Sequence, residues 1–99
     1  MRQFDVCSLK VRSDQLVVVL QHDTVDELDT RVVAPLSAAP YQRLMERLRI
    51  PVTLGGDEYV VQLDRMAAVS VRELGQVRGS LAKFEQPVKN GIDLLIFGV

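Results

Sequence analysis

Few residues in this chain have the type and spacing that catalysis requires. Cys7 is the sole cysteine and His22 the sole histidine, so a Cys–His nucleophile pair would have to join these two. Cys7 lies in an apolar run typical of a strand, which favours a packed thiol. No spacing joins either residue to acidic ligands in the pattern of a metal site. The sequence therefore predicts no catalytic residue, no resident metal or cofactor, and no enzymatic activity.

Two other clusters bear on ion binding. Four carboxylates crowd one polar stretch, and carboxylate oxygens are the ligands that divalent cations prefer; they are Asp23, Asp26, Glu27 and Asp29. Gly55-Gly56-Asp57 is too short for a phosphate cradle, has no lysine after it and leads into a strand-like run. A solvated loop and a turn are the favoured interpretations.

Length and composition point to one small domain with a protein partner. The 99 residues suffice for one modest core, so residues 1–99 are expected to form a single domain. No apolar run approaches the ~20 residues needed to cross a bilayer, and the start lacks the apolar stretch of a signal peptide. A single cysteine favours a reducing, cytoplasmic setting. Net charge is −1, with twelve basic residues scattered among thirteen acids, which argues against direct nucleic-acid binding.

Strand-like patterns fill most of the chain. In residues 3–11 the apolar parity shifts after Val6, which predicts a β-bulge. Residues 16–20 are apolar on both faces and predict a central strand. Pro35 pushes the strand at 31–36 towards a sheet edge. Further strands are expected at residues 52–54, 59–63 and 67–71, the first two joined as a hairpin by a Gly-rich turn.

Two segments have helical spacing. Residues 40–49 place apolar side chains at helical intervals. Residues 85–99 form the clearest helix, because Pro87 fits a first turn and no breaker follows before Gly98. Residues 76–83 favour neither state. Short strands followed by a helix predict a mainly β (α+β) domain, a curled antiparallel sheet with a C-terminal α-helix packed on it.

The last helix carries an apolar residue on its polar face. At about 100° per residue, Ile92 and Leu95 return to within roughly 40° of Val88 and form the core-facing stripe. Phe97 falls about 180° from Val88. It either covers a neighbouring strand as the helix frays or projects as an aromatic anchor for a partner. Gly91 indicates close packing against the sheet or a second subunit.

The order of motifs along the chain resembles the CcdB family. Residues 88–99 follow that family's C-terminal pattern and end in aromatic-Gly-aliphatic. Similar residues recur in order over essentially the whole chain: Gln3-Phe4, residues 16–21 followed by Asp23, Pro35-Leu36, Pro51-Val52, Gly56-Asp57-Glu58 and Met66-Ala67. The resemblance implies a small SH3-like antiparallel β-barrel with a C-terminal α-helix. It also implies a homodimeric toxin of a type II toxin–antitoxin system.

The same resemblance implies how such a toxin acts. Family members bind the A subunit of DNA gyrase, trap the complex with cleaved DNA, and are neutralised by a CcdA-like antitoxin. The gyrase-binding positions carried over onto this chain are Phe97, Gly98 and Val99, with Asp93 one turn earlier, Gln3 and Phe4 at the start, and His22, Thr24 and Val25 after the second strand.

Two positions depart from the family pattern. Gyrase-poisoning members carry Trp where this chain has Phe97, and the sequence contains no Trp. Phe keeps a stacking face but lacks the indole N–H and some area, a loss of about 1–2 kcal/mol per anchor. Thr24 replaces an aliphatic residue. A weakened site, a site retuned to another gyrase, and an abandoned site all stay open.

Two alternatives to a gyrase poison follow. A relative that no longer kills would survive as an antitoxin-binding decoy. An endoribonuclease of the MazF or PemK kind, which shares this barrel, would need a basic groove and an acid–base pair. The scattered charge disfavours the ribonuclease, and Arg31 and Arg72 are the residues whose mutation would test it.

Overall fold

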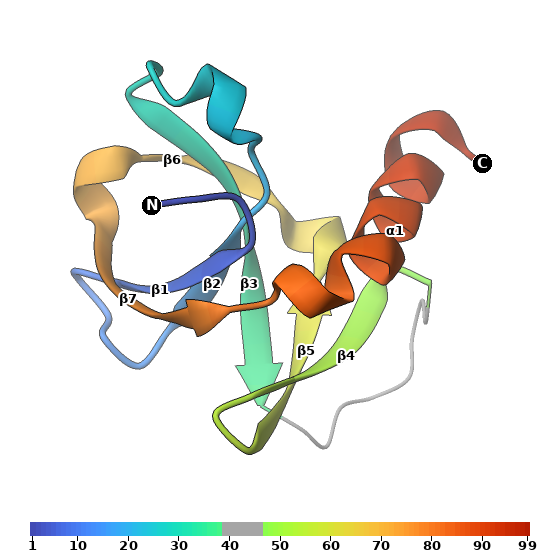
Figure 1. Cartoon of the computed structure of the whole chain (residues 1–99), viewed down its shortest axis with the longest axis horizontal. Helices are drawn as coiled ribbons and strands as arrows, with labels where there is room; N and C mark the ends of the chain where they lie inside the picture. The colour runs from blue at the N-terminus through green and yellow to red at the C-terminus, as the bar shows by residue number, and fades with distance from the viewer. Residues whose placement is uncertain (39–46) are drawn as a thin grey trace.

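The computed structural model describes residues 1–38 and 47–99, which form seven strands and one α-helix (Figure 1). The strands are β1 (Asp5–Leu9), β2 (Leu16–Val19), β3 (Thr30–Ala38), β4 (Arg49–Leu54), β5 (Asp57–Gln62), β6 (Ala67–Ser70) and β7 (Leu74–Ser80). The helix is α1 (Glu85–Phe97), and four 3-10 turns lie at η1 (Asp23–Val25), η2 (Leu63–Arg65), η3 (Val71–Glu73) and η4 (Ala82–Phe84).

All recorded strand pairs are antiparallel, in the order β4-β5-β3-β2-β1-β7, with β6 paired to β3. The sheet curls until Gly79 of β7 lies against the side chain of Leu54 of β4. Among the described residues these two edge strands do not pair, so the curled sheet stays open. The mainly β fold with a C-terminal helix is confirmed.

Strand β2 is central, as its apolar pattern predicts, and it separates two hydrophobic clusters. Val18 and Leu20 face the main core, whereas Val17 and Val19 face a smaller cluster on the other side. The bulge predicted for the first strand is also present, because the register of β1 against β7 shifts on either side of Cys7. Such a shift bends the strand and helps the sheet to curl.

The prediction that Pro35 marks a sheet edge is wrong. Strand β3 pairs with β2 on one side, and on the other with β6 over Thr30–Val33 and with β5 over Leu36–Ala38. The Val32 carbonyl oxygen accepts from the Leu20 N–H, so Val32 directs its backbone to the side of β3 on which β2 lies. Odd-numbered residues such as Pro35 direct their backbone to the opposite side, where β6 and β5 pair. Pro35 lies there in the gap between β6 and β5, where no N–H is needed.

The hairpin is confirmed with tighter boundaries. Leu54 pairs with Asp57, so only Gly55 and Gly56 form the loop, with φ of +60° and +87°. The helix predicted for residues 40–49 falls mostly on 39–46, outside the described residues; Arg49 belongs to β4. The undecided segment 76–83 continues β7 to Ser80 and then enters η4.

Helix α1 packs on the main core as far as Ile92. Val88 is fully buried, Ile92 packs against the same cluster, and an added Cβ at Gly91 would overlap Leu63 and lie 3.0 Å from the Arg47 carbonyl oxygen. Leu95, predicted to continue this stripe, is 38 % exposed because the last turns extend beyond the strands (Figure 1). No helix in the described part of the chain has the length and apolarity to span a membrane.

Candidate functional site

The end of α1 presents apolar side chains to solvent. Phe97 is 73 % exposed and Val99 83 % exposed, and Ile96 is exposed beside them. A large apolar group in water carries a free-energy cost that burial against a partner would remove. The tip, defined here as Leu95, Ile96, Phe97, Gly98 and Val99, is therefore suited to a protein interface.

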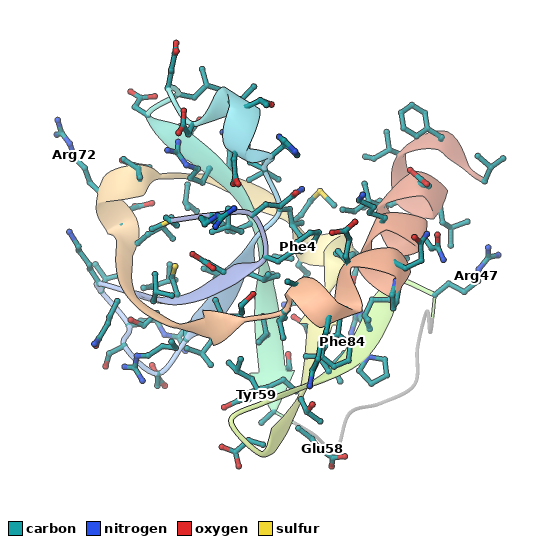
Figure 2. The ribbon with its side chains drawn as sticks, in the orientation of Figure 1. Phe4, Arg47, Glu58, Tyr59, Arg72 and Phe84 are labelled. Carbon is teal, nitrogen blue, oxygen red and sulfur yellow. The ribbon has the colours of Figure 1, made fainter. Side chains whose placement is uncertain are left out.

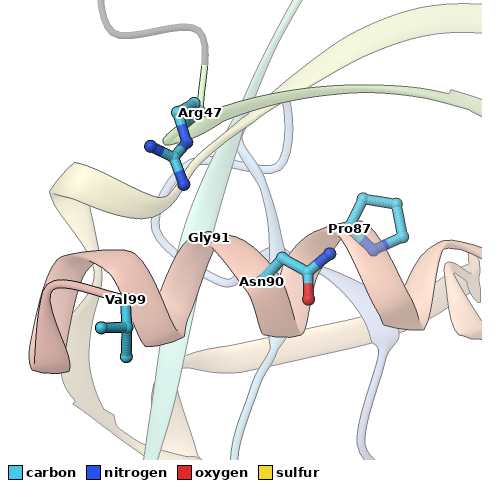
Figure 3. Close-up of a pocket in the computed structure, with 5 residues that line it drawn as sticks. All are labelled: Arg47, Pro87, Asn90, Gly91 and Val99. Carbon is cyan, nitrogen blue, oxygen red and sulfur yellow. The ribbon is translucent and has the colours of Figure 1, made fainter.

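Gly98 sets the direction in which the tip ends. Its φ of +76° is left-handed, and its N–H donates to the Leu94 carbonyl oxygen at 3.0 Å. A left-handed C-terminal glycine stops a helix without the penalty that a Cβ would add. The turn brings Val99 to one end of a groove of about 380 Å³ along α1. Figure 3 shows Arg47 on one side of this groove, with Pro87, Asn90 and Gly91 along the helix.

Asp93 stands one turn before Phe97, and both side chains are exposed. Residues four apart lie on the same helix face, so the predicted pair shares one surface. Asn90 lies one turn earlier still and accepts from Gln86 Nε2 at 2.9 Å. Helical geometry placed Phe97 opposite the core-facing stripe, and the exposure of Asp93 and Phe97 agrees with that placement.

The second group of predicted residues gathers around η1. His22 precedes the turn, and its Nδ1 accepts a hydrogen bond from the Thr24 N–H at 3.1 Å. The same Nδ1 lies 3.0 Å from the Thr24 hydroxyl oxygen. Thr24 and Val25 are exposed. Gln3 joins them from the N-terminal segment, because its backbone N–H donates to Asp23 Oδ1 at 2.7 Å.

Phe4 is placed differently from the expectation. Its side chain is 4 % exposed and belongs to the main core, as Figure 2 shows by its position within the molecule. A buried ring has no surface to offer a partner, so the prediction of Phe4 as a contact residue does not fit this structure. Its backbone instead joins segments: the N–H donates to Val19 and the carbonyl accepts from Leu81, at 2.7 and 2.8 Å.

The structure brings Gln3, His22, Thr24 and Val25 together but keeps the tip separate. The first group lies around η1, at the top of the molecule in Figure 1, whereas the tip ends α1 at the right. No hydrogen bond or ion pair within residues 1–38 and 47–99 is recorded between the two groups. Sequence reasoning missed Asp23 as a structural residue, since four carboxylates in one stretch give no signal of which one binds the backbone.

Of the remaining reactive groups, Cys7 is buried, Arg31 is hydrogen-bonded and Arg72 is exposed. Burial is the main cause that raises the pKa of the Cys7 thiol, which disfavours a nucleophilic thiolate. The Arg31 guanidinium donates to the carbonyl oxygens of Leu28, Thr30 and Asp26, whereas Arg72 extends from the edge of the molecule (Figure 2). Among the described residues no three His, Cys, Asp or Glu side chains converge as metal ligands.

The chain matches one family model and resembles many solved structures, among them two toxins. The family model described as "CcdB protein" matches residues 3–98. The crystal structure of an Mtb toxin is 23 % identical in sequence, with a TM-score of 0.72, covering 88 % of this chain and 94 % of that one. The Mycobacterium tuberculosis toxin MazF-mt6 is 24 % identical, with a TM-score of 0.73, covering 93 % of each chain.

At these identities the two solved structures establish likeness of fold alone. The family model, in contrast, spans nearly the whole chain, including η1, the hairpin and all but the last residue of the tip. The chain therefore belongs to the CcdB family, whose members are toxins of toxin–antitoxin systems.

Proposed function

We propose that the protein is the toxin of a type II toxin–antitoxin pair and poisons DNA gyrase by inserting the tip of α1 into the A subunit. Exposure of Phe97 and Val99 on a helix fixed by buried Val88 and close-packed Gly91 is the observation that supports it. A rigid anchor loses little conformational freedom on binding. In the proposal the toxin acts as a homodimer, which presents two tips to the two A subunits.

The N-terminal group supplies a second contact in this proposal. The short turn η1 contains Thr24 and Val25, and Gln3 and His22 lie beside it. Asp93 adds a carboxylate one turn before Phe97. Gly98 keeps the left-handed turn that ends the helix, and Phe4 supports the group from within the core. A CcdA-like antitoxin is the proposed partner that neutralises the toxin.

The deciding experiment is a DNA cleavage assay with gyrase from the source organism. Purified protein, gyrase, ATP and supercoiled plasmid are mixed, and linear DNA is scored after denaturation. The wild type is expected to yield linear DNA and Phe97→Ala none. Phe97→Trp is expected to act at about tenfold lower concentration, because the larger anchor adds about 1–2 kcal/mol.

A matched control separates the tip from general apolar exposure. Val99 and Val11 are 83 % and 84 % exposed, but only Val99 belongs to the tip. Val99→Ala should weaken poisoning, whereas Val11→Ala should match the wild type. Equal effects of both changes would contradict the proposal.

The assay also tests the two alternatives. Folded wild-type protein that binds its antitoxin but yields no linear DNA with its own gyrase would identify a non-toxic relative. Cleavage of RNA by the pure protein, lost in Arg72→Ala, would identify an endoribonuclease. The fold likeness to MazF-mt6 is the reason to test this activity.

A further inference from the structure

Asp23, the first residue of η1, binds the N-terminal segment to the turn. Its Oδ1 accepts the Gln3 N–H at 2.7 Å, and its Oδ2 lies 3.6 Å from Arg2 Nε. The Gln3 side chain adds a bond of 2.8 Å from Nε2 to the Leu20 carbonyl oxygen. One carboxylate thus joins two segments that are twenty residues apart.

The other side of Gln3 is fixed by the backbone of Phe4. Phe4 has a φ of +70°, the left-handed conformation that non-glycine residues rarely adopt. Such a conformation persists only where the surroundings impose it. Here the buried ring and the bonds to Val19 and Leu81 impose it, so Gln3 is held between Phe4 and Asp23.

We infer that Asp23 is a positioning residue for partner binding, which fixes Gln3 together with the exposed Thr24 and Val25 as one preformed surface. The inference rests on the proposed gyrase function, because the partner is the same. Preformed contact residues pay less ordering entropy when the partner binds. Without the carboxylate, the Gln3 N–H loses its acceptor and residues 1–3 are freed from η1.

The ionised state of Asp23 agrees with this role. The Gln3 N–H is the main cause that holds the pKa of the Asp23 carboxyl below its usual value, against partial desolvation and with help from Arg2 and His22. The carboxylate is therefore charged at neutral pH, and hydrogen bonds to a charged acceptor are stronger than neutral ones.

Three variants of the full chain test the inference. Asp23→Ala removes the acceptor, and Asp23→Asn keeps an oxygen at its position. Asp26→Asn removes a charge at the other end of the same turn, where the backbone carbonyl rather than the carboxylate makes the recorded bond to Arg31. Asp23→Leu, which has the shape of Asp without its acceptors, takes the place of the alanine variant if that variant folds poorly.

Two measurements are made on each variant, after thermal unfolding has shown that it is folded. The first is hydrogen exchange of the Gln3 amide by NMR, which needs no partner. The second is the affinity for the gyrase A subunit by calorimetry. Asp23→Ala should expose the Gln3 amide and weaken binding about tenfold, the effect of losing one charge-assisted bond. Asp23→Asn should restore most of both, and Asp26→Asn should match the wild type.

The outcomes separate this inference from the function on which it rests. An Asp23→Ala variant with an unprotected Gln3 amide and unchanged affinity overturns the inference and leaves gyrase binding in place. Equal weakening in Asp26→Asn also overturns it, because charge alone would then explain the effect. A folded wild type that does not bind the A subunit overturns both.

Discussion

Gly91 of α1 lies against Leu63 of η2 so closely that an added Cβ would overlap the Leu63 side chain. The Arg47 carbonyl oxygen closes the same space, 3.0 Å from that Cβ position. Leu63 is fully buried and a backbone oxygen cannot rotate away, so neither neighbour can move aside freely. This contact sets how near α1 lies to the sheet, and hence where the tip begins.

Gly91→Ala should therefore destabilise the fold. The gain in helix propensity is about 1 kcal/mol, while overpacking a dense core costs about 1–3 kcal/mol, so a net loss of up to about 2 kcal/mol is expected. Urea unfolding measures it. Asn90→Ala, at the exposed neighbouring position, is the control and should be neutral or stabilising; a stabilised Gly91→Ala would contradict the packing described.

Asp64 should make stability depend on acid pH. Its carboxylate accepts from Arg49 Nε at 2.6 Å and from the second guanidinium nitrogen at 2.8 Å, with side chains 19 % and 12 % exposed. This hydrogen bond is the main cause that lowers the pKa of Asp64 below its ordinary 3.8. The unfolded chain then takes up the proton first, so the stabilisation is present above pH 3.8 and is lost as the pH falls through the folded-state pKa.

The measurement is urea unfolding of Asp64→Asn at neutral pH and in acid. At neutral pH the variant should lose about 1–3 kcal/mol, because the Arg49 charge keeps no anionic partner at Asp64. The difference from the wild type should shrink as the pH falls below the ordinary carboxyl range. Asp57→Asn, an exposed carboxylate in the hairpin, is the control and should show neither effect.

The hairpin loop should tolerate change at only one of its two glycines. Loops with positive φ at both positions favour Asn-Gly as well as Gly-Gly, so Gly55→Asn should leave stability nearly unchanged. Gly56→Val places a β-branched side chain at a φ of +87° and should cost about 1–2 kcal/mol. Thermal unfolding of the two variants decides; a tolerated valine would show that the loop adopts another conformation.

Much of the fold could be predicted because its signals are local. The parity shift near Cys7 predicted the bulge, two adjacent glycines predicted the hairpin, and an apolar run on both faces predicted central β2. Helical geometry placed Phe97 opposite the core-facing stripe but left open whether it covers a strand or projects, and in the structure it is exposed. Each of these depends on residues that are neighbours in sequence.

What could not be predicted depends on long-range packing. Pro35 suggested an edge strand, because sequence does not reveal that β3 changes partner from β6 to β5 beside it. Leu95 has the helical spacing of the core-facing stripe, but the last turns of α1 extend beyond the strands and leave it exposed. Phe4 resembles a surface contact by its place in the family, whereas the left-handed turn of its backbone directs the ring inward. Which of the four carboxylates accepts the Gln3 N–H likewise depends on where the N-terminal segment lies in the fold.

Ile92 and Leu95 test directly how far the core extends under α1. Both belong to the predicted stripe, yet Ile92 packs against the main core and Leu95 is 38 % exposed. Ile92→Ala should cost about 2–4 kcal/mol, because it deletes contacts in a packed region. Leu95→Ala removes as many carbon atoms but should cost less than about 1 kcal/mol, as at other exposed positions. Chemical denaturation of the pair measures the contrast. Equal losses would mean that Leu95 packs on the core or on a second copy of the chain, and the tip would then begin at Ile96.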